Sequence, residues 1–340
     1  MTKEKGIRNS NVELLRIVAI ILVLIIHGSF RSLGAPTYEE ISTLPFSSFL
    51  RFFSQSASVV CVNIFILISG WFGITIRTSR IVELLFQILF FCTIIYIVLI
   101  LMGITTFSIS RYIRLFFFNG SYWFIKAYLF LYILSPLLNI FAEKSSKRQM
   151  ITFLIAFFSF QTIYDCIADT PWLGGGFSPI SFIGLYLLAR FLRNDSNQVI
   201  TKQKGYIYFI IYCSTVLFSS FMSLLLPNGM SFFYYYSSPI VIISSVSLFL
   251  FFIRIRINSK MINWIAVSSF AVYIFHSCPL VFESYFITQI QKWHSNLALT
   301  DFIINSALFF LCIFSLSIFL DKVRIIIWHC IDKQLQTRFK

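Results

Sequence analysis

About ten apolar runs, most of them near 20 residues long, follow one another along the chain. An α-helix rises about 1.5 Å per residue, so about 20 apolar residues cross a hydrocarbon core roughly 30 Å thick. The sequence therefore predicts an all-α fold, a polytopic membrane helical bundle with about 10 transmembrane helices. The runs cover residues 12–30, 53–73, 81–103, 122–141, 151–167, 179–192 (short for a span), 206–226, 232–253, 264–282 and 302–320.

The composition agrees with a membrane protein. Hydrophobic residues make up 58% of the chain and charged residues 12%, whereas soluble proteins average about half apolar and about a quarter charged. The net charge of +14 indicates no nucleic-acid partner, because the basic residues fall in short loops between apolar runs, as the positive-inside rule describes. Residues 1–340 are predicted to form a single integral-membrane domain with a basic cytoplasmic tail from about residue 321.

The distribution of basic residues also predicts the topology. With about ten crossings the two termini lie on one side, and 20 of the 27 Lys and Arg residues fall on that side. Cytoplasmic loops carry an excess of Lys and Arg, so both termini are predicted to be cytoplasmic. The expected location is the cell (inner or plasma) membrane, with the lipid bilayer as the surrounding partner.

The first apolar run carries three ionisable residues, Glu13, Arg16 and His27. A charge near the bilayer centre costs at least ~2.5–3.5 kcal/mol, so such residues usually line a protein cavity and mark a function. Arg16 and His27 are eleven positions apart, which is about three turns and about 16 Å of helix, so both project from one face. An imidazole titrates close to neutral pH, which suits His27 as a general base for an alcohol.

Two later runs contain polar residues that each have a structural alternative. His276 lies in VYIFHSCPL, which the predicted topology puts in the outer half of the bilayer near the level of His27. A core imidazole that donates to a backbone carbonyl explains His276 equally well. Ser69 precedes Gly70 in VNIFILISGW, where small residues let a ligand approach the helix, or, as the simpler explanation, let a neighbouring helix pack closely.

The fourth run begins with Tyr122, Trp123 and Lys126. Lys126 places an amine inside the membrane near the outer face, although a lysine there can instead extend to the membrane surface. Together with Ser69, these residues are candidate hydrogen-bond donors to an oxyanion, and the sequence does not rank the four.

Arg77 and Arg80 stand three positions apart at the start of the third run. Two guanidinium groups at this spacing form a fork for phosphate oxygens, which bind more firmly at a helix N-terminus. Glu83, one turn further on, is in a position to orient one of them, and ordinary positive-inside charge is the alternative interpretation of the pair. The scattered cysteines form no Cys-x-x-Cys pair, and no metal site is predicted.

The order of these motifs resembles that of acyltransferase family 3, a family of multi-pass membrane O-acyltransferases. The resemblance is carried by five stretches in sequence: ELLRIVAIILVLIIH with Arg16 and His27, then NIFILISGW, then Arg77 and Arg80, then YWFIKAYLFLYILSPLLN, and finally VYIFH. The first of these, an arginine followed by ten residues and a histidine, is the most specific. The resemblance runs through nearly the whole chain.

The resemblance implies an enzyme that transfers an acyl group, usually acetyl from acetyl-CoA, to a hydroxyl of a cell-surface or lipid-linked glycan. Acyl-CoA is then a co-substrate, and no bound cofactor is expected. His27 is implied as the essential base and Arg16 as a pore-lining partner, with Glu13 beside it. Arg77 and Arg80 are implied as contacts to the coenzyme A phosphates.

The roles of the remaining candidates are open. Ser69 is assigned to the donor side together with the arginine pair, and His276 to the acceptor or oxyanion side together with Tyr122, Trp123 and Lys126. A second class of function, a transporter or flippase for a polysaccharide or lipid-linked glycan, also explains polar residues inside a helical bundle. The sequence has no paired Gly- or Pro-broken helices in matching halves, which disfavours an inverted-repeat transporter.

Overall fold

The computed structural model describes residues 9–116, 122–168, 173–194, 203–227 and 231–338. This part of the chain is helical and contains no strand. Seven of its helices are long and apolar enough to cross a membrane, namely Ser10–Leu33, Pro45–Phe72, Thr78–Leu101, Trp123–Lys144, Gly205–Leu225, Phe232–Arg254 and Leu299–Lys333. The prediction of an all-helical, multi-pass membrane protein is confirmed, while the count of about ten spans and the side of the termini stay predictions.

The chain divides into two compact units. Unit 1 comprises Met1–Phe30, Gly34–Thr75 and Ala127–Val267, and unit 2 comprises Arg31–Leu33, Ile76–Lys126 and Ser268–Lys340.

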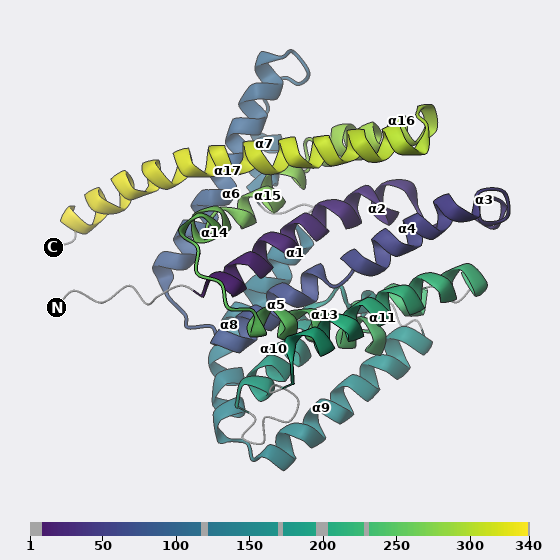
Figure 1. Cartoon of the computed structure of the whole chain (residues 1–340). Coiled ribbons are helices and arrows are strands. Elements are labelled where there is room, and N and C mark those ends of the chain that lie inside the picture. Colours follow the sequence, from purple (N-terminus) through teal and green to yellow (C-terminus); the bar gives the residue numbers. More distant parts are fainter. Residues whose placement is uncertain (1–8, 117–121, 169–172, 195–202, 228–230, 339–340) are drawn as a thin grey trace. The chain divides into compact units, whose positions relative to one another are not determined.

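Helix α1 (Ser10–Gly28) lies among four other helices of unit 1 (Figure 1). It packs against α4 (Pro45–Ser58), α5 (Cys61–Phe72), α13 (Pro239–Arg254) and α14 (Lys260–Ala266). Its buried face is mostly aliphatic, with Leu15, Ala19 and Leu24 at or below 1% exposure. The helix that carries the polar residues of the first run is therefore a core helix of its unit.

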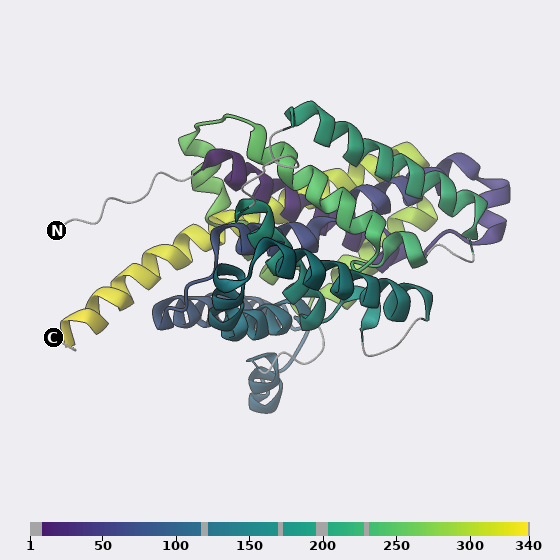
Figure 2. The same ribbon diagram turned by 90° about the horizontal axis from the view of Figure 1, so that it is seen from below.

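The other helices of unit 1 also pack against one another. α11 (Gly205–Leu225) packs on α4 and on α13, as Figure 2 shows, and α10 (Pro179–Asn194) packs on α5 and on α9 (Lys147–Gln161). Proline at the first position begins α4 and α13, where its missing N–H costs no helical hydrogen bond. The remaining elements of unit 1 are α3 (Tyr38–Thr43), α8 (Trp123–Lys144) from Ala127 onward, the π-helical turn Thr162–Ile167, the 3-10 turn Gly174–Gly176 and α12 (Ser231–Tyr234).

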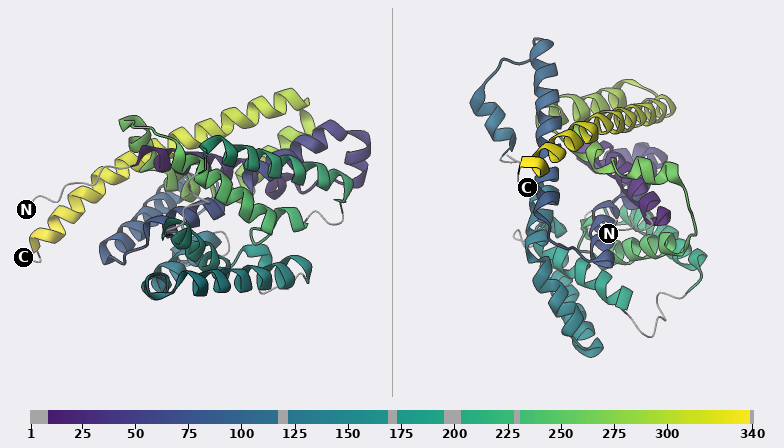
Figure 3. Two further views of the ribbon diagram at one scale, coloured as in Figure 1. Left: turned by 60° about the horizontal axis from the view of Figure 1, so that its bottom comes forward. Right: turned by 90° about the vertical axis from the view of Figure 1, so that its left-hand side faces the viewer.

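Unit 2 is built around two long helices, α6 (Thr78–Leu101) and α17 (Leu299–Arg338). α17 crosses α6 (Figure 3) and also packs on α15 (Ser269–His276) and α16 (Thr288–Asn296). The short helix α7 (Ile109–Phe116) is tied back to α6, because the Tyr96 hydroxyl accepts from the Ser108 N–H at 2.7 Å and the Thr93 and Tyr112 hydroxyls lie 2.7 Å apart. The remaining elements are most of α2 (Phe30–Leu33), the start of α8 and the π-helical segment Phe282–Ile287.

Three of the ten predicted spans, the runs 151–167, 179–192 and 264–282, do not appear among the seven long apolar helices. α10 has 16 residues, which is short for a crossing, and α9 has 15 residues and continues into the π-helical turn Thr162–Ile167. The run at 264–282 is interrupted twice: α14 ends at Ala266, and α15 ends at His276 before Pro279. Proline has no N–H to donate to the carbonyl four residues back, so α15 cannot continue through Pro279.

Gly70 explains why small residues lie in the second run. A Cβ at this position would lie 2.5 Å from the Tyr186 carbonyl oxygen and 2.8 Å from the Ala189 Cβ. The glycine therefore lets α5 approach the backbone of α10, which confirms the packing interpretation of this motif.

We expect Gly70→Ala to destabilise the protein by about 1–3 kcal/mol, because the added methyl group meets backbone that cannot move aside cheaply. Thermal unfolding of the purified protein in detergent measures this as a lower midpoint. Gly205→Ala is a milder comparison, since its added Cβ would lie 3.3 Å from the Arg254 Cβ, a tight contact that needs only a small shift of that side chain, and is expected to lower the midpoint less. Equal midpoints for Gly70→Ala and the wild type would contradict close packing at Gly70.

Candidate functional site

Glu13 and Arg16 form an ion pair near the start of α1. One guanidinium nitrogen of Arg16 lies 3.3 Å from each carboxylate oxygen of Glu13. Glu13 is buried and the Arg16 side chain is 37% exposed. A buried carboxylate requires a partner, so Glu13 holds the Arg16 guanidinium in place while part of it remains accessible.

His27 lies in the last turn of α1 and is half-buried. The same helix therefore carries Arg16 and His27 without interruption, and eleven residues of helix separate them by about 16 Å along its axis. Just beyond His27, the Ser29 hydroxyl lies 3.2 Å from the Ser54 hydroxyl of α4.

A layer of buried hydroxyl groups continues from α4 into the neighbouring helices of unit 1. The Ser56 hydroxyl accepts from Ser220 at 3.1 Å and donates to the Tyr234 hydroxyl at 3.4 Å. Tyr234 in turn lies 2.8 Å from the Ser223 hydroxyl, and its ring contacts Phe30. The sequence analysis missed this layer, because single serines in apolar runs give no signal of the partner they meet.

Arg51 anchors the segment that follows α1. Its guanidinium lies 2.6 Å from Glu40 and donates to the Gly34 carbonyl at 2.9 Å. Burial raises the pKa of the Glu40 carboxyl, but hydrogen bonds from the Thr37 backbone and from Arg51 outweigh it, so the pKa lies below its ordinary value. The ion pair is therefore formed at neutral pH and ties the loop to α4.

Ser69 has both of its hydrogen-bonding roles filled. Its hydroxyl donates to the Phe65 carbonyl of its own helix at 2.9 Å and lies 3.2 Å from the Tyr128 hydroxyl. Its one proton is therefore used within α5, and the Tyr128 hydroxyl donates to it.

The segment between α5 and α6 is held by two polar side chains that the sequence analysis did not single out. The Tyr186 hydroxyl accepts from the Ile74 N–H at 2.9 Å and donates to the side-chain oxygen Oδ1 of Asn139 at 2.7 Å. The Asn139 amide then donates to the Ile74 carbonyl at 2.9 Å, which closes the cycle. Asn139 lies in the motif YILSPLLN, so an amide inside an apolar run was the available signal.

Arg77 and Arg80 occupy the N-terminus of α6, as predicted. Arg77 is the N-cap residue, and the Arg80 N–H donates to its carbonyl at 3.0 Å. Both side chains are exposed. Two accessible guanidinium groups at the positive end of a 24-residue helix form an arrangement that suits phosphate.

Glu83 does not orient this pair but belongs to a second network between α6 and α17. It lies 3.2 Å from Arg324, whose guanidinium also contacts both carboxylate oxygens of Asp321 at 2.9 and 3.2 Å. The Gln87 amide donates to Asp321 at 2.9 Å. Asp321 is fully buried and Arg324 is 3% exposed, so this pair lies inside unit 2 although it falls in the segment predicted as a basic tail.

Tyr122, Trp123 and Lys126 lie in unit 2 at the start of α8. The Tyr122 ring is fully buried, and its hydroxyl donates to the Ile274 carbonyl at 2.8 Å. Trp123 is half-buried and Lys126 is exposed. The hydroxyl proton of Tyr122 is therefore already used.

His276 is 2% exposed, and both of its ring nitrogens have partners. Nδ1 lies 2.5 Å from the Val272 carbonyl of its own helix, and Nε2 lies 3.2 Å from the Ser277 hydroxyl. The rings of Phe282 and Phe286 surround the imidazole. This environment favours the structural interpretation, a core imidazole with its hydrogen bonds satisfied.

The predicted site residues divide between the two units. Unit 1 contains Glu13, Arg16, His27 and Ser69, and unit 2 contains Arg77, Arg80, Tyr122, Trp123, Lys126 and His276. Within the described ranges, no group of three or more His, Cys, Asp and Glu side chains is arranged to hold a metal ion.

The fold defines a multi-pass helical membrane protein in which α1, a core helix of unit 1, carries Glu13, Arg16 and His27. The family model of the acyltransferase domain of acyltransferase family 3 matches residues 9–320. The chain belongs to this family and is a membrane acyltransferase, which favours the enzyme over the transporter. Comparisons with curated proteins and with solved structures give no match.

Proposed function

We propose that the protein is an O-acyltransferase that moves an acyl group, acetyl in the simplest case, from cytoplasmic acyl-CoA to a hydroxyl of a cell-surface or lipid-linked glycan. The observation that carries the proposal is the acyltransferase match over residues 9–320, which includes the helix with Arg16 and His27. The proposed location is the cell membrane.

The geometry of α1 suits the delivery of a thioester. Coenzyme A is too highly charged to enter a bilayer, so its nucleotide stays at the membrane surface while its narrow pantetheine arm enters the protein. The distance of about 16 Å between Arg16 and His27 is of the length that this arm must span. Arg16, held by Glu13 and partly exposed, lines the proposed path of the arm.

The proposed reaction is one acyl transfer assisted by one base. The imidazole of His27 takes the proton of the acceptor hydroxyl while the hydroxyl oxygen attacks the thioester carbonyl carbon. A C–O bond forms and the C–S bond breaks. The departing thiolate of coenzyme A receives the proton from the imidazolium, so the products are an ester and the free thiol.

The negative charge on the carbonyl oxygen in the transition state requires a hydrogen-bond donor. The hydroxyl protons of Ser69 and Tyr122 already bond to the Phe65 and Ile274 carbonyls. Trp123 and Lys126 are the other candidate donors in this proposal.

Arg77 and Arg80 are proposed to hold phosphate groups of coenzyme A, and this prediction separates the enzyme from the transporter. We expect the double variant Arg77→Ala, Arg80→Ala to bind acetyl-CoA about tenfold more weakly or worse, since charge-assisted hydrogen bonds contribute roughly 1.5–3 kcal/mol each. Isothermal titration of the purified protein measures the change. Lysine at either position is expected to restore binding only partly, because the guanidinium fork is lost.

The matched control is the second pair of arginines at the same spacing, Arg111 and Arg114 on α7, which the predicted topology places on the opposite side. Alanine at both of these positions is expected to leave acetyl-CoA affinity unchanged. If the Arg77, Arg80 double variant bound acetyl-CoA as tightly as the wild type, the pair would be ordinary positive-inside charge and not a phosphate site. A wild type that binds no acetyl-CoA would favour the transporter.

A further inference from the structure

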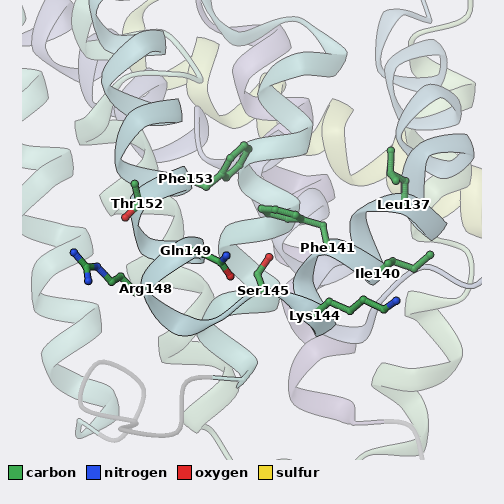
Figure 4. A pocket seen from close by; sticks show the side chains of 9 residues that line it. All are labelled: Leu137, Ile140, Phe141, Lys144, Ser145, Arg148, Gln149, Thr152 and Phe153. Atoms are coloured by element: carbon green, nitrogen blue, oxygen red, sulfur yellow. The ribbon is translucent and has the colours of Figure 1, made fainter.

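An open groove lies in unit 1 where α8 ends and α9 begins. It has a volume of about 740 Å³ and is lined by side chains from both helices and the turn between them (Figure 4). None of the residues proposed for acyl transfer lines it. The groove is therefore a separate feature of the acyltransferase.

The lining of the groove changes in character along its length. Leu137, Phe141 and Phe153 provide an apolar wall, in which the two phenyl rings meet edge to face at 5.3 Å. Figure 4 shows Lys144 and Arg148 at opposite rims near the turn, with polar side chains between them. An apolar wall that ends in two cations is complementary to a molecule with an apolar tail and an anionic head.

No described residue compensates the positive charge of the groove. Neither Lys144 nor Arg148 makes an ion pair with a described residue. The acidic neighbour, Glu143, lies 3.4 Å from Arg190. Figure 4 shows the two charged ends directed away from each other, so an anionic group at the turn is attracted by each cation from its own side and displaces no carboxylate.

The turn that carries the cations is closed by a capping box. The Ser146 hydroxyl accepts from the Gln149 N–H at 3.2 Å, and the Gln149 side-chain oxygen accepts from the Ser146 N–H at 2.8 Å. This reciprocal cap fixes the start of α9 between Lys144 and Arg148 and adds the positive end of the helix dipole. The cap thus defines where α9 begins beside the groove.

We propose that this groove binds an anionic phospholipid of the surrounding bilayer, with its headgroup at the turn that carries Lys144 and Arg148 and an acyl chain along Phe141 and Phe153. The predicted topology places the turn at the cytoplasmic surface, where anionic lipids attract basic residues near a helix end. A phospholipid uses both parts of the groove, whereas inorganic phosphate uses only the cationic end.

Native mass spectrometry of the purified protein tests the proposal with phosphatidylglycerol and phosphatidylcholine of identical acyl chains. The wild type is expected to retain phosphatidylglycerol in preference, and 10 mM inorganic phosphate, about a physiological concentration, is expected not to displace it. The double variant Lys144→Gln, Arg148→Gln is expected to lose this preference by about fivefold for each removed charge. Lys147→Gln is the matched control, because it removes the same charge from the same turn but from a residue outside the groove.

A wild type without preference for phosphatidylglycerol would overturn the proposal, as would a loss per removed charge that is as large in Lys147→Gln as in the double variant. Displacement by inorganic phosphate would assign the cations to a free anion instead. The variant Lys144→Arg, Arg148→Lys keeps both charges and therefore tests the proposal even if the glutamine variant does not fold. It is expected to keep the preference for phosphatidylglycerol. Loss of the preference in this variant, at wild-type thermal stability, would also contradict the proposal.

Discussion

We expect His27→Ala to abolish acyl transfer while the amount of folded protein in the membrane stays close to that of the wild type. A general base contributes about 10²–10⁴-fold to the rate, so less than a tenth of wild-type turnover is expected. Alanine is small and neutral, so the helix inserts at least as easily. Turnover of acetyl-CoA by equal amounts of purified wild type and variant measures the effect.

His276→Ala is the matched control, since it removes a second histidine whose two ring nitrogens already bond to Val272 and Ser277. Its expected effect is a lower melting temperature, with turnover per folded molecule reduced far less than in His27→Ala. If His27→Ala kept more than about a tenth of the wild-type rate, His27 would not be the base. Equally deep losses in both variants would assign a chemical role to His276.

The second large effect is expected at the buried ion pair of α17. Replacing Arg324 with alanine leaves Asp321, which is fully buried, with only the Gln87 amide as a described partner among the present contacts. Removing one member of a buried pair costs about 3–5 kcal/mol, because an uncompensated charge remains. A strong fall in folded yield and in melting temperature of the detergent-purified protein is therefore expected.

Removing both charges is the informative comparison. The double variant Asp321→Leu, Arg324→Met keeps a similar volume and leaves no isolated buried charge, so it is expected to be markedly more stable than Arg324→Ala. Glu83→Gln is a milder control, because the Glu83 side chain is 47% exposed. An Arg324→Ala protein with wild-type stability would show that the pair does not hold α17 to α6.

The long helices were predictable because length and apolarity are local properties of the sequence. Residues 81–103 and 206–226, for example, correspond closely to α6 and α11. The interruption of the run at 264–282 was less visible, since apolar residues continue across Ser268 and Pro279 while the helix does not. In this run proline was the available signal, and hydropathy alone concealed it.

Part of the candidate site was also predictable. The position of Arg77 at a helix start and the close packing at Gly70 followed from local patterns and are confirmed. The partner of Glu83 was predicted wrongly, because Arg324 lies 241 positions away in sequence. The hydrogen bond of Tyr122 to Ile274 likewise joins distant segments, and no local pattern reports such a partner.

Mass spectrometry of cell-surface and lipid-linked glycans tests the proposed acyl transfer most directly. Cells with the gene, cells without it, and deleted cells that carry either the wild-type gene or His27→Ala are compared. We predict an acyl ester on one glycan that is present with the wild-type gene, absent after deletion, restored by the wild type and not restored by His27→Ala. The same glycan acylation in all four strains would contradict the proposed function.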